Sequence, residues 1–236
     1  MVATKVGRYA EGCDFSYDRV TRSIDESLER LQTDYIDVLQ CHDMEFAGSL
    51  EQVVTEALPA MQRAKREGKC RHIGVTGLPL MVVDYIIDRC QDVEIDIDTI
   101  LSYCCMNINN EALLQYLPRW KHKGIGIMQG GATSMGLLTA QGPQKWHPAP
   151  QQLRSVCAEA VAFCEEQDAS IAQLAFQFTF AQSALDSTLV GVTDLEQLDE
   201  YLVSQTLVSL GLRDGYSMCS GRAGCICPST KECWLK

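Results

Sequence analysis

TDYIDVLQCHD, residues 33–43, joins a run typical of a buried strand to three residues that can do chemistry. Residues 35–39 are mostly apolar or aromatic with two β-branched members, which favours a strand that is buried in a sheet. The run ends on Cys41, His42 and Asp43. Three interpretations follow for this ending: a catalytic site, a metal site, or a strand that meets water.

The segments on either side of this stretch have helical periodicity. Residues 16–31 place four apolar residues on one helical face, with Ser16 as the expected N-cap: Val20, Ile24, Leu28 and Leu31. Downstream, an apolar stripe runs over residues 50–61, and Gly68 ends that helix. The chain therefore alternates strand and helix.

The same alternation continues to about residue 203. Strands are predicted at residues 1–5, 35–42, 71–77, 99–105, 125–131 and 187–192. Helices are predicted at residues 16–31, 50–67, 78–90, 110–124, 151–166, 170–182 and 194–203. Six strands, each followed by helix through short linkers, predict an α/β fold with a parallel, buried sheet.

Two architectures compete for these six strands. The count fits a six-stranded doubly wound sheet, whereas a (β/α)₈ barrel needs eight strands and typically about 250 residues. The first strand, however, is followed by TKVGRYAEG, which does not fit the G-x-G-x-x-G phosphate loop of open nucleotide-binding sheets. The strand count favours the open sheet, and the missing phosphate loop argues against it.

Composition excludes several classes of protein. The formal net charge is −11, and no Lys/Arg cluster is interleaved with aromatic residues, so nucleic acid is not expected as a partner. No apolar run approaches the roughly 20 residues that span a bilayer, and residues 1–12 do not resemble a secretory signal. We therefore expect no membrane association and a cytoplasmic location.

The twelve cysteines fall into two groups. Cys70, Cys90, Cys157 and Cys164 sit inside apolar periodic segments, where a reduced cysteine acts as a small buried hydrophobe. The second group belongs to a Gly- and Ser-rich tail and has C-x₅-C-x-C-x₅-C spacing: Cys219, Cys225, Cys227 and Cys233. That spacing lacks the paired C-x₂-C knuckles of structural zinc sites, so residues 209–236 are expected to be a disordered tail after a domain of residues 1–208.

In a parallel α/β fold, functional residues gather at the carboxyl ends of the strands. Lys5 ends an otherwise apolar strand, and a lysine that points into a barrel mouth must pair or lose its proton; otherwise it simply reaches water. His42 is similarly either a catalytic group or a satisfied structural histidine. In an extended chain Cys41 and Asp43 point away from His42, which argues against a metal site and against a Cys–His nucleophile.

The strand ends and their flanks resemble the aldo-keto reductase family. SIDESLERLQTDYIDVLQCHD is similar to the helix and fourth barrel strand that deliver the family's active-site histidine. GKCRHIGVTGLP and TLVGVTDLEQLDEYL resemble its fifth strand and its closing strand with the cofactor-binding helix. CHDMEF, VTGLPL, ILSYC, MGLLT and WHPAP are similar to the L-galactose dehydrogenase branch of the family.

This resemblance, which runs from about Thr4 to about Val203, implies a (β/α)₈ TIM barrel that lacks its first two β/α units. The six strands would be strands three to eight. Family catalysis uses Asp, Tyr, Lys and His, in which the tyrosine protonates the carbonyl oxygen as the nicotinamide delivers hydride. Lys5 and His42 match two of the four, and the aspartate and the tyrosine belong to the missing part.

The resemblance also implies the positions that bind the nicotinamide cofactor. They are Thr76, Ser102, Tyr103, Gly131, Thr133 and Leu137, together with Gly191, Thr193, Gln197 and Glu200 at the end that binds adenosine. Tyr201 stands where the family commonly has Asn, and Gly130 to Thr133 replace the usual Ser-Pro-Leu. No basic residue at the start of the last helix is placed to bind a 2′-phosphate, so NAD is favoured over NADP.

Two functions of different classes remain. The first is an oxidoreductase that transfers hydride between a nicotinamide and C1 of a sugar or a related aldehyde, with Trp146 and His147 lining the sugar pocket. The second is a catalytically silent isoform that acts at most in binding or regulation. A barrel without two strands would expose two unpaired edges, which favours self-association.

Overall fold

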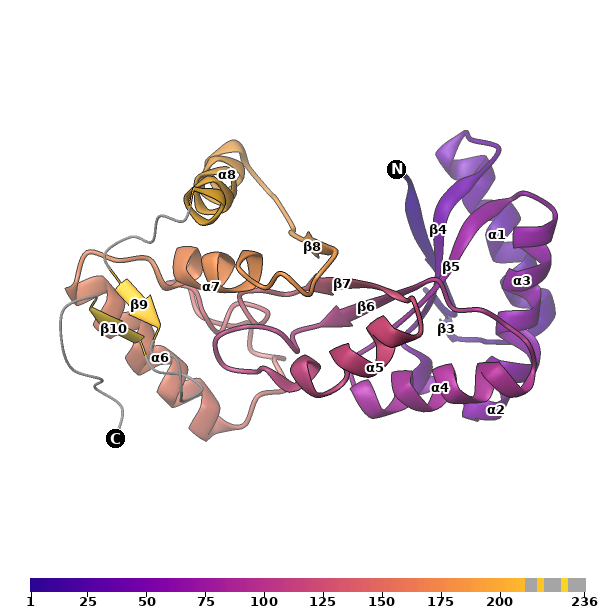
Figure 1. The fold of residues 1–236 in the computed structure, drawn as a ribbon, viewed down its shortest axis with the longest axis horizontal. Coiled ribbons are helices and arrows are strands. Elements are labelled where there is room, and N and C mark those ends of the chain that lie inside the picture. Colours follow the sequence, from indigo (N-terminus) through magenta and orange to yellow (C-terminus); the bar gives the residue numbers. More distant parts are fainter. Residues whose placement is uncertain (211–215, 219–225, 229–236) are drawn as a thin grey trace. The chain divides into compact units, whose positions relative to one another are not determined.

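The computed structural model describes residues 1–210, except the side chain of Glu196, and the backbone of residues 216–218 and 226–228. Helices and strands alternate along most of the chain (Figure 1). The predicted tail of residues 209–236, with its four cysteines, lies for the most part outside the described residues. No helix in the described part is long and apolar enough to cross a membrane.

Six strands form one sheet, in the order β1-β4-β5-β6-β7-β8. Their bounds are Ala3–Val6, Ile36–His42, Cys70–Gly77, Thr99–Tyr103, Gly126–Gly130 and Ser187–Leu189. The spatial order follows the chain order without the reversal that defines a doubly wound sheet. The chain is therefore an α/β protein with six parallel strands of the TIM-barrel type, as the resemblance implied.

The α-helices follow these strands in turn. Their bounds are α1 Tyr17–Leu31, α2 Leu50–Gln52, α3 Leu58–Arg66, α4 Leu80–Asp92, α5 Leu117–His122, α6 Gln151–Glu166, α7 Ile171–Phe180 and α8 Leu195–Ser209. Short elements join them: the hairpin β2 (Arg8–Tyr9) with β3 (Gly12–Cys13), the 3₁₀ turns η1 (Met44–Phe46) and η3 (Ala112–Gln115), the π-helix η2 (Val53–Ala57), and the antiparallel pair β9 (Tyr216–Met218) with β10 (Ile226–Pro228).

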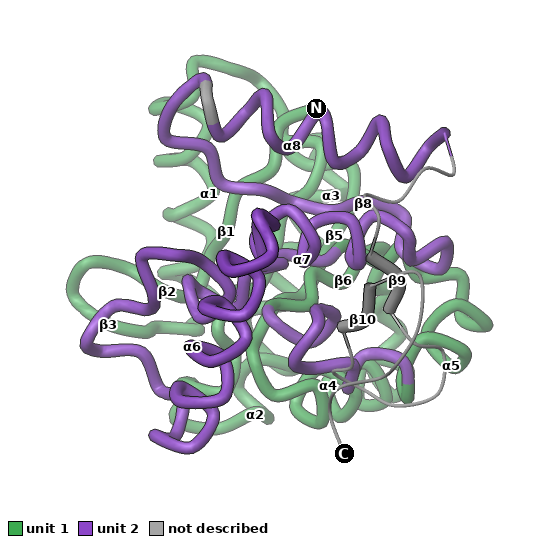
Figure 2. Tube along the Cα trace, turned by 90° about the vertical axis from the view of Figure 1, so that its left-hand side faces the viewer, with its two compact units in different colours: residues 1–103, 115–128 green, residues 104–114, 129–236 purple. Residues whose placement is uncertain are grey.

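The chain divides into two compact units (Figure 2). Unit 1 comprises residues 1–103 and 115–128, and unit 2 comprises residues 104–114 and 129–236. Strand β7 passes from one unit to the other along the chain. Each unit is described separately below.

Unit 1 holds the regular part of the sheet, with α1 and α3 beside β4 and β5 (Figure 1). Strands β1, β4, β5 and β6 pair in parallel, and the register puts Lys5 opposite Gln40 and His42 opposite Thr76. Successive residues of β4 point to opposite sides of the sheet, and residues paired across neighbouring strands share a side. Val38, Leu101 and Met128 form a small apolar cluster, and the register places Val38 and Leu101 on the same face as Gln40, His42 and Thr76.

Helix α1 departs from its prediction in two respects. Ser16 occupies the N-cap position with extended backbone, but its side chain makes no capping hydrogen bond. Leu31 is 47% exposed, whereas Ser23 and Ser27 are buried on the helix face that packs inward. The Ser27 hydroxyl donates to the Ser23 carbonyl at 2.7 Å, so small polar residues can be buried there, while Leu31 lies in the last turn of the helix.

Unit 2 has its own apolar core between α6 and α7. Its buried members are Ile108, Leu137, Leu138, Cys157, Cys164, Ile171 and Ala175.

The four cysteines predicted inside apolar segments occur in both units. Cys70, Cys90, Cys157 and Cys164 are all buried free thiols, so their interpretation as small hydrophobes is confirmed.

Candidate functional site

Two rows of residues cross one face of the unit 1 sheet, near the carboxyl ends of its strands. Register places Lys5, Gln40, Gly74 and Thr99 side by side on neighbouring strands. The next row contains His42, Thr76 and Leu101 on the same face. The parallel pairing thus brings Lys5, His42 and Thr76, three of the predicted site residues, onto one surface.

Lys5 stands in this surface with its side chain largely exposed. None of the described residues forms an ion pair or a hydrogen bond with its ammonium group. Its positive charge is nevertheless close enough to His42 to lower the pKa of the imidazole. The two predicted catalytic residues therefore act on each other electrostatically.

His42 is about half buried, and burial is the largest cause of a pKa below the ordinary 6.5. Asp43 opposes this effect, because its carboxylate raises the pKa of the ring. The Asp43 Oδ1 atom lies 3.2 Å from His42 Nε2, and Asp43 Oδ2 accepts a hydrogen bond from Arg8 Nη1. An imidazole in this setting is predominantly neutral near pH 7.

Asp43 was expected on the opposite side of the strand from His42, and this expectation is wrong. Its backbone leaves the extended conformation, with φ 55° and ψ 48°, and its N–H donates to the Thr76 carbonyl at 2.9 Å. The left-handed turn brings the carboxylate back to His42. The alternation rule holds for Cys41, which is fully buried on the other face and has a pKa raised by burial, so its thiol is not a nucleophile.

The row that contains Lys5 also carries buried polar atoms that lack partners. Gln40 is 3% exposed, and its Oε1 atom has no hydrogen-bond partner among the described residues. The buried Thr99 Oγ1 atom also has no hydrogen-bond partner there. A Cβ atom on Gly74 would lie 2.4 Å from Thr99 Oγ1 and 3.1 Å from Gln40 Cγ. Glycine at this position therefore lets two unsatisfied polar groups occupy the space between β4 and β6.

The predicted residues at the ends of β5 and β6 do not share one face. The Thr76 hydroxyl donates to the Leu101 carbonyl at 2.8 Å, on the face of His42. Ser102 pairs with Gly77, so it points to the other side, where it is fully buried with an unpartnered hydroxyl. Tyr103 returns to the first face and is 40% exposed.

Glu45 is a site residue that sequence reasoning missed. Its Oε1 accepts the Leu78 N–H at 2.9 Å, and a Cβ atom on Gly77 would lie 2.6 Å from its Oε2. Glu45 thereby connects η1 to the turn after β5, and its charge raises the pKa of His42. Arg8 and Gln40 were missed as well, whereas Asp43 was considered but expected on the wrong side of the strand. A glutamine within the predicted buried strand was a signal in the sequence that could have drawn attention to Gln40.

In unit 2, the predicted cofactor loop after β7 is a series of tight turns. Gly131 has φ 75°, and the Ser134 N–H donates to its carbonyl at 2.9 Å. The Thr133 carbonyl accepts hydrogen bonds from the backbone N–H groups of Gly136 and Leu138. The Leu137 side chain is 2% exposed and packs in the unit 2 core, and its N–H donates to the Ser134 carbonyl. Leu137 therefore anchors the loop to the core, and its side chain is not exposed to a ligand.

Trp146 and His147 have different environments within unit 2. Trp146 is 70% exposed, and its ring stacks on His147 with centroids 6.4 Å apart. His147 is buried, with Nε2 3.1 Å from the Ser134 carbonyl and Nδ1 accepting the Ala149 N–H at 3.0 Å. Both ring nitrogens of His147 are therefore engaged by backbone, and Trp146 is the member of the pair that is open to a ligand.

The predicted adenosine end lies at the start of α8. Asp194 caps this helix by accepting the Gln197 N–H at 2.9 Å, and Gln197 Oε1 accepts the Thr193 N–H at 3.1 Å. Gly191, Thr193 and Glu200 are exposed. These contacts bring Thr193 and Gln197 together as one local turn.

Tyr201, which departs from the family pattern, has a structural role in the same region. Its hydroxyl donates to the Gly191 carbonyl at 3.3 Å, and its ring packs against Phe176 with centroids 4.1 Å apart. Burial raises the pKa of this phenol. Tyr201 therefore ties the loop after β8 to α7 and α8.

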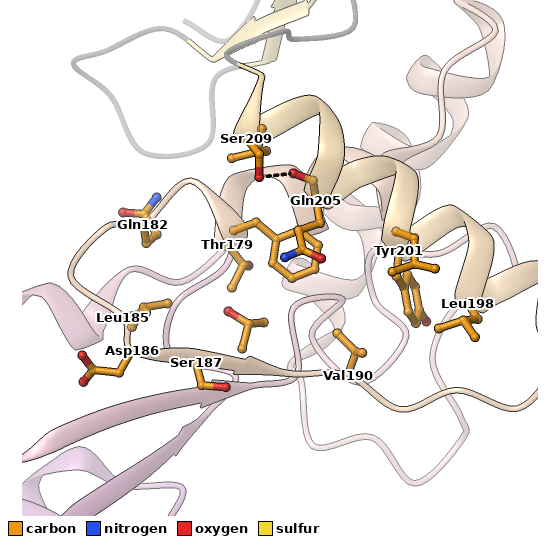
Figure 3. A pocket seen from close by; sticks show the side chains of 14 residues that line it. Thr179, Gln182, Leu185, Asp186, Ser187, Val190, Leu198, Tyr201, Gln205 and Ser209 are labelled. Atoms are coloured by element: carbon orange, nitrogen blue, oxygen red, sulfur yellow. Dashed lines mark hydrogen bonds between the residues drawn. The ribbon is translucent and has the colours of Figure 1, made fainter.

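A cavity of about 440 Å³ lies between α7, β8 and α8 (Figure 3). Leu198, Tyr201, Gln205 and Ser209 line it from one side of α8 (Figure 3). Gln197 and Glu200 do not line it, so the cavity is separate from the predicted adenosine residues. Among the residues that the structure describes, no group of three or more His, Cys, Asp or Glu side chains could hold a metal ion.

Comparison with known proteins agrees with this fold. A profile described as "Aldo/keto reductase family" matches residues 1–208. L-galactose dehydrogenase of Arabidopsis thaliana is 50% identical over 213 residues, which are 90% of this chain and 66% of that protein. D-arabinose 1-dehydrogenase of Saccharomyces cerevisiae is 33% identical over 204 residues, 84% of this chain and 60% of that protein.

Among solved structures, the holo form of an aldo-keto reductase from Bacillus halodurans superposes with a TM-score of 0.66 at 21% identity. The match covers 90% of this chain and 72% of that one, and at this identity it bears on the fold alone. The chain thus spans 60 to 66% of the length of the two dehydrogenases above. The profile match over residues 1–208, together with these relatives, shows that the chain belongs to the aldo/keto reductase family.

Proposed function

We propose that this chain acts in the NAD-dependent oxidation of an aldose at C1, with L-galactose as the first substrate to test. The observation that carries the proposal is the placement of Lys5 and His42 on one face at the carboxyl ends of adjacent parallel strands. The 50% identity to an L-galactose dehydrogenase supports the choice of sugar.

The residues of unit 1 fit the nicotinamide end of such a cofactor. A carboxamide N–H₂ group needs hydrogen-bond acceptors, and Gln40 Oε1 is a buried acceptor without a partner on the face of Lys5 and His42. When bound, the cofactor would supply a hydride acceptor. Lys5 would then place a positive charge beside the C1 oxygen, and the neutral His42 would orient the C1 hydroxyl and take up the proton that leaves as hydride is transferred.

The residues at the start of α8 favour NAD over NADP. Asp194, Asp199 and Glu200 are exposed carboxylates, and a carboxylate accepts hydrogen bonds from a ribose diol but repels a 2′-phosphate. Trp146, exposed and backed by His147, offers an apolar ring against which a sugar ring can pack.

A turnover assay tests the proposal. The purified full chain is mixed with NAD and L-galactose, and NADH formation is followed by absorbance. We expect turnover in the wild type and a large loss in Lys5→Met, because the site loses its cation. Lys65→Met is the matched control, since Lys65 pairs with Asp98 at 2.6 Å away from this face and should leave turnover unchanged.

The alternative, a catalytically silent isoform, gives a different result. It predicts no turnover with either NAD or NADP, and no difference between Lys5→Met and Lys65→Met. Equal residual activity in these two variants would contradict a role of Lys5 in the reaction.

A further inference from the structure

Arg8, Asp43 and His42 form a connected chain of charged and titratable groups in unit 1. The Asp43 carboxylate touches both neighbours, with Oδ1 3.2 Å from His42 Nε2 and Oδ2 bound to Arg8. The Asp43 side chain is 15% exposed, so water does not dominate its surroundings. This connection was not expected from the sequence.

Backbone structure holds this chain of groups in place. Asp43 is fixed by its left-handed conformation, by its N–H bond to Thr76 and by the Phe46 N–H, which donates to its carbonyl at 3.0 Å as η1 begins. Arg8 belongs to the β2/β3 hairpin, where it pairs with Cys13, and its guanidinium lies 5.9 Å from the centre of the Phe46 ring. Two separate segments therefore converge on one carboxylate.

The Asp43 carboxylate lies beside the Nε2 atom of His42, which bears on the tautomer of the ring. A neutral imidazole has one N–H and one bare nitrogen, and the tautomer follows from the group next to each nitrogen. A carboxylate oxygen at 3.2 Å from Nε2 favours the proton on Nε2, since a bare nitrogen there would face another lone pair. No described residue is hydrogen-bonded to Nδ1, which is left as an acceptor.

We propose that Asp43, held by Arg8, is a positioning residue that keeps His42 in its Nε2–H tautomer, so that Nδ1 accepts a hydrogen bond from a hydroxyl of the substrate. The inference rests on the proposed function and adds the form of the substrate to it. A sugar hydroxyl has a proton to donate, and the carbonyl of the oxidised product has none. The site therefore selects the alcohol side of the reaction.

Other charges face His42 and set the sign of each expected change. Asp43 and Glu45 raise the pKa of the imidazole, while Lys5 and Arg8 lower it, and burial lowers it most. Removing the Asp43 charge should lower the pKa of His42 further. Removing the Arg8 charge should raise it.

Long-range ¹H–¹⁵N NMR on the ¹⁵N-labelled full chain reports both the tautomer and the titration of each of its four histidines. His42→Gln assigns the signal. Asp43→Gly removes the carboxylate and tolerates the positive φ, and Asp43→Asn keeps an acceptor but removes the charge. Asp37→Asn is the matched control, because Asp37 lies on the same strand and pairs with Arg71 at 3.1 Å.

We expect the wild type and Asp43→Asn to hold His42 as Nε2–H, and Asp43→Gly to lose the preference for one tautomer. Both Asp43 variants should lower the pKa of His42, Arg8→Met should raise it, and Asp37→Asn should leave it unchanged. L-galactose should shift the Nδ1 signal, and its C1 lactone should not.

Two results would overturn the inference. One is an Asp43→Gly variant whose tautomer and titration match the wild type. The other is a wild-type Nδ1 that already carries the proton. Neither readout needs turnover, so a chain that fails to oxidise L-galactose but shows the expected tautomers contradicts the proposed function and leaves the role of Asp43 intact.

Discussion

The residues assigned to catalysis in unit 1 and those assigned to cofactor binding in unit 2 are held by different means. Lys5, Gln40, His42 and Thr76 are placed by the register of paired parallel strands, on a face that they share with buried apolar residues. The residues around α8 are placed by a helix cap and a few local hydrogen bonds among exposed side chains. A substitution near the first set should therefore affect the whole unit, and one in the second set should have local effects.

The largest contrast is expected from truncating leucines. Leu39 is fully buried on β4, between Val38 and Gln40, and Leu39→Ala should lower the free energy of unfolding by about 2–5 kcal/mol. Leu195 is 78% exposed at the start of α8, and Leu195→Ala should change it by less than about 0.5 kcal/mol. Urea unfolding followed by circular dichroism measures both. Equal effects would remove the basis of the comparison.

Two glycines give the next contrast. A Cβ atom on Gly77 would lie 2.6 Å from Glu45 Oε2, so Gly77→Ala should lower the free energy of unfolding by about 1 kcal/mol, because the Glu45 side chain must turn aside and lose its hydrogen bond to the Leu78 N–H. Gly191 has no heavy atom within 4 Å of the corresponding position, so Gly191→Ala should leave stability nearly unchanged and weaken cofactor binding instead. Thermal unfolding and an NAD titration separate these effects. A tolerated Gly77→Ala would show that Glu45 moves freely.

The N-caps of α8 and α1 test whether local hydrogen bonds hold the residues around α8. Asp194 caps α8 through its side chain, and Asp194→Ala should cost about 1 kcal/mol. Ser16 occupies the same position on α1 without a side-chain hydrogen bond, so Ser16→Ala should have a smaller effect. Chemical denaturation of the two variants checks the order, and the reverse order would mean that the α8 cap is not formed in solution.

The smallest effect concerns pH. Because burial lowers the pKa of His42 in the folded chain, the unfolded chain takes up this proton first as pH falls. The stability that the folded chain gains from a neutral His42 is thus fully present above the ordinary pKa of 6.5. It is lost as pH falls from 6.5 through the lower pKa that His42 has in the folded chain. His42→Gln should flatten the profile of unfolding free energy against pH in this window, which urea unfolding repeated at several pH values measures.

Most of the fold could be predicted because periodicity and register are properties of the sequence. The six strands, α6 and the start of α8 lie close to their predicted bounds. The π-helix η2 and the two-residue strands of the β2/β3 hairpin could not be predicted, since neither has a sequence period long enough to detect. The buried Ser23 and Ser27 were missed for a related reason: polar residues were assumed to face water.

The candidate site was less predictable, because side-chain direction depends on backbone turns. Alternation along an ideal strand put Asp43 away from His42, and one left-handed residue reversed that result. Ser102 lies on the opposite face from Thr76 because strand register, rather than nearness to the strand end, decides the face. The ring of His147 is bound on both nitrogens by backbone groups that only the folded loop supplies.

Cofactor binding by the full chain is the most direct test of the account. NAD and NADP are each titrated into the wild-type protein while intrinsic tryptophan fluorescence is recorded. We expect saturable quenching with NAD at lower concentrations than with NADP, because exposed carboxylates flank the start of α8. The absence of quenching by either cofactor up to millimolar concentration would contradict a nicotinamide-dependent role for this chain.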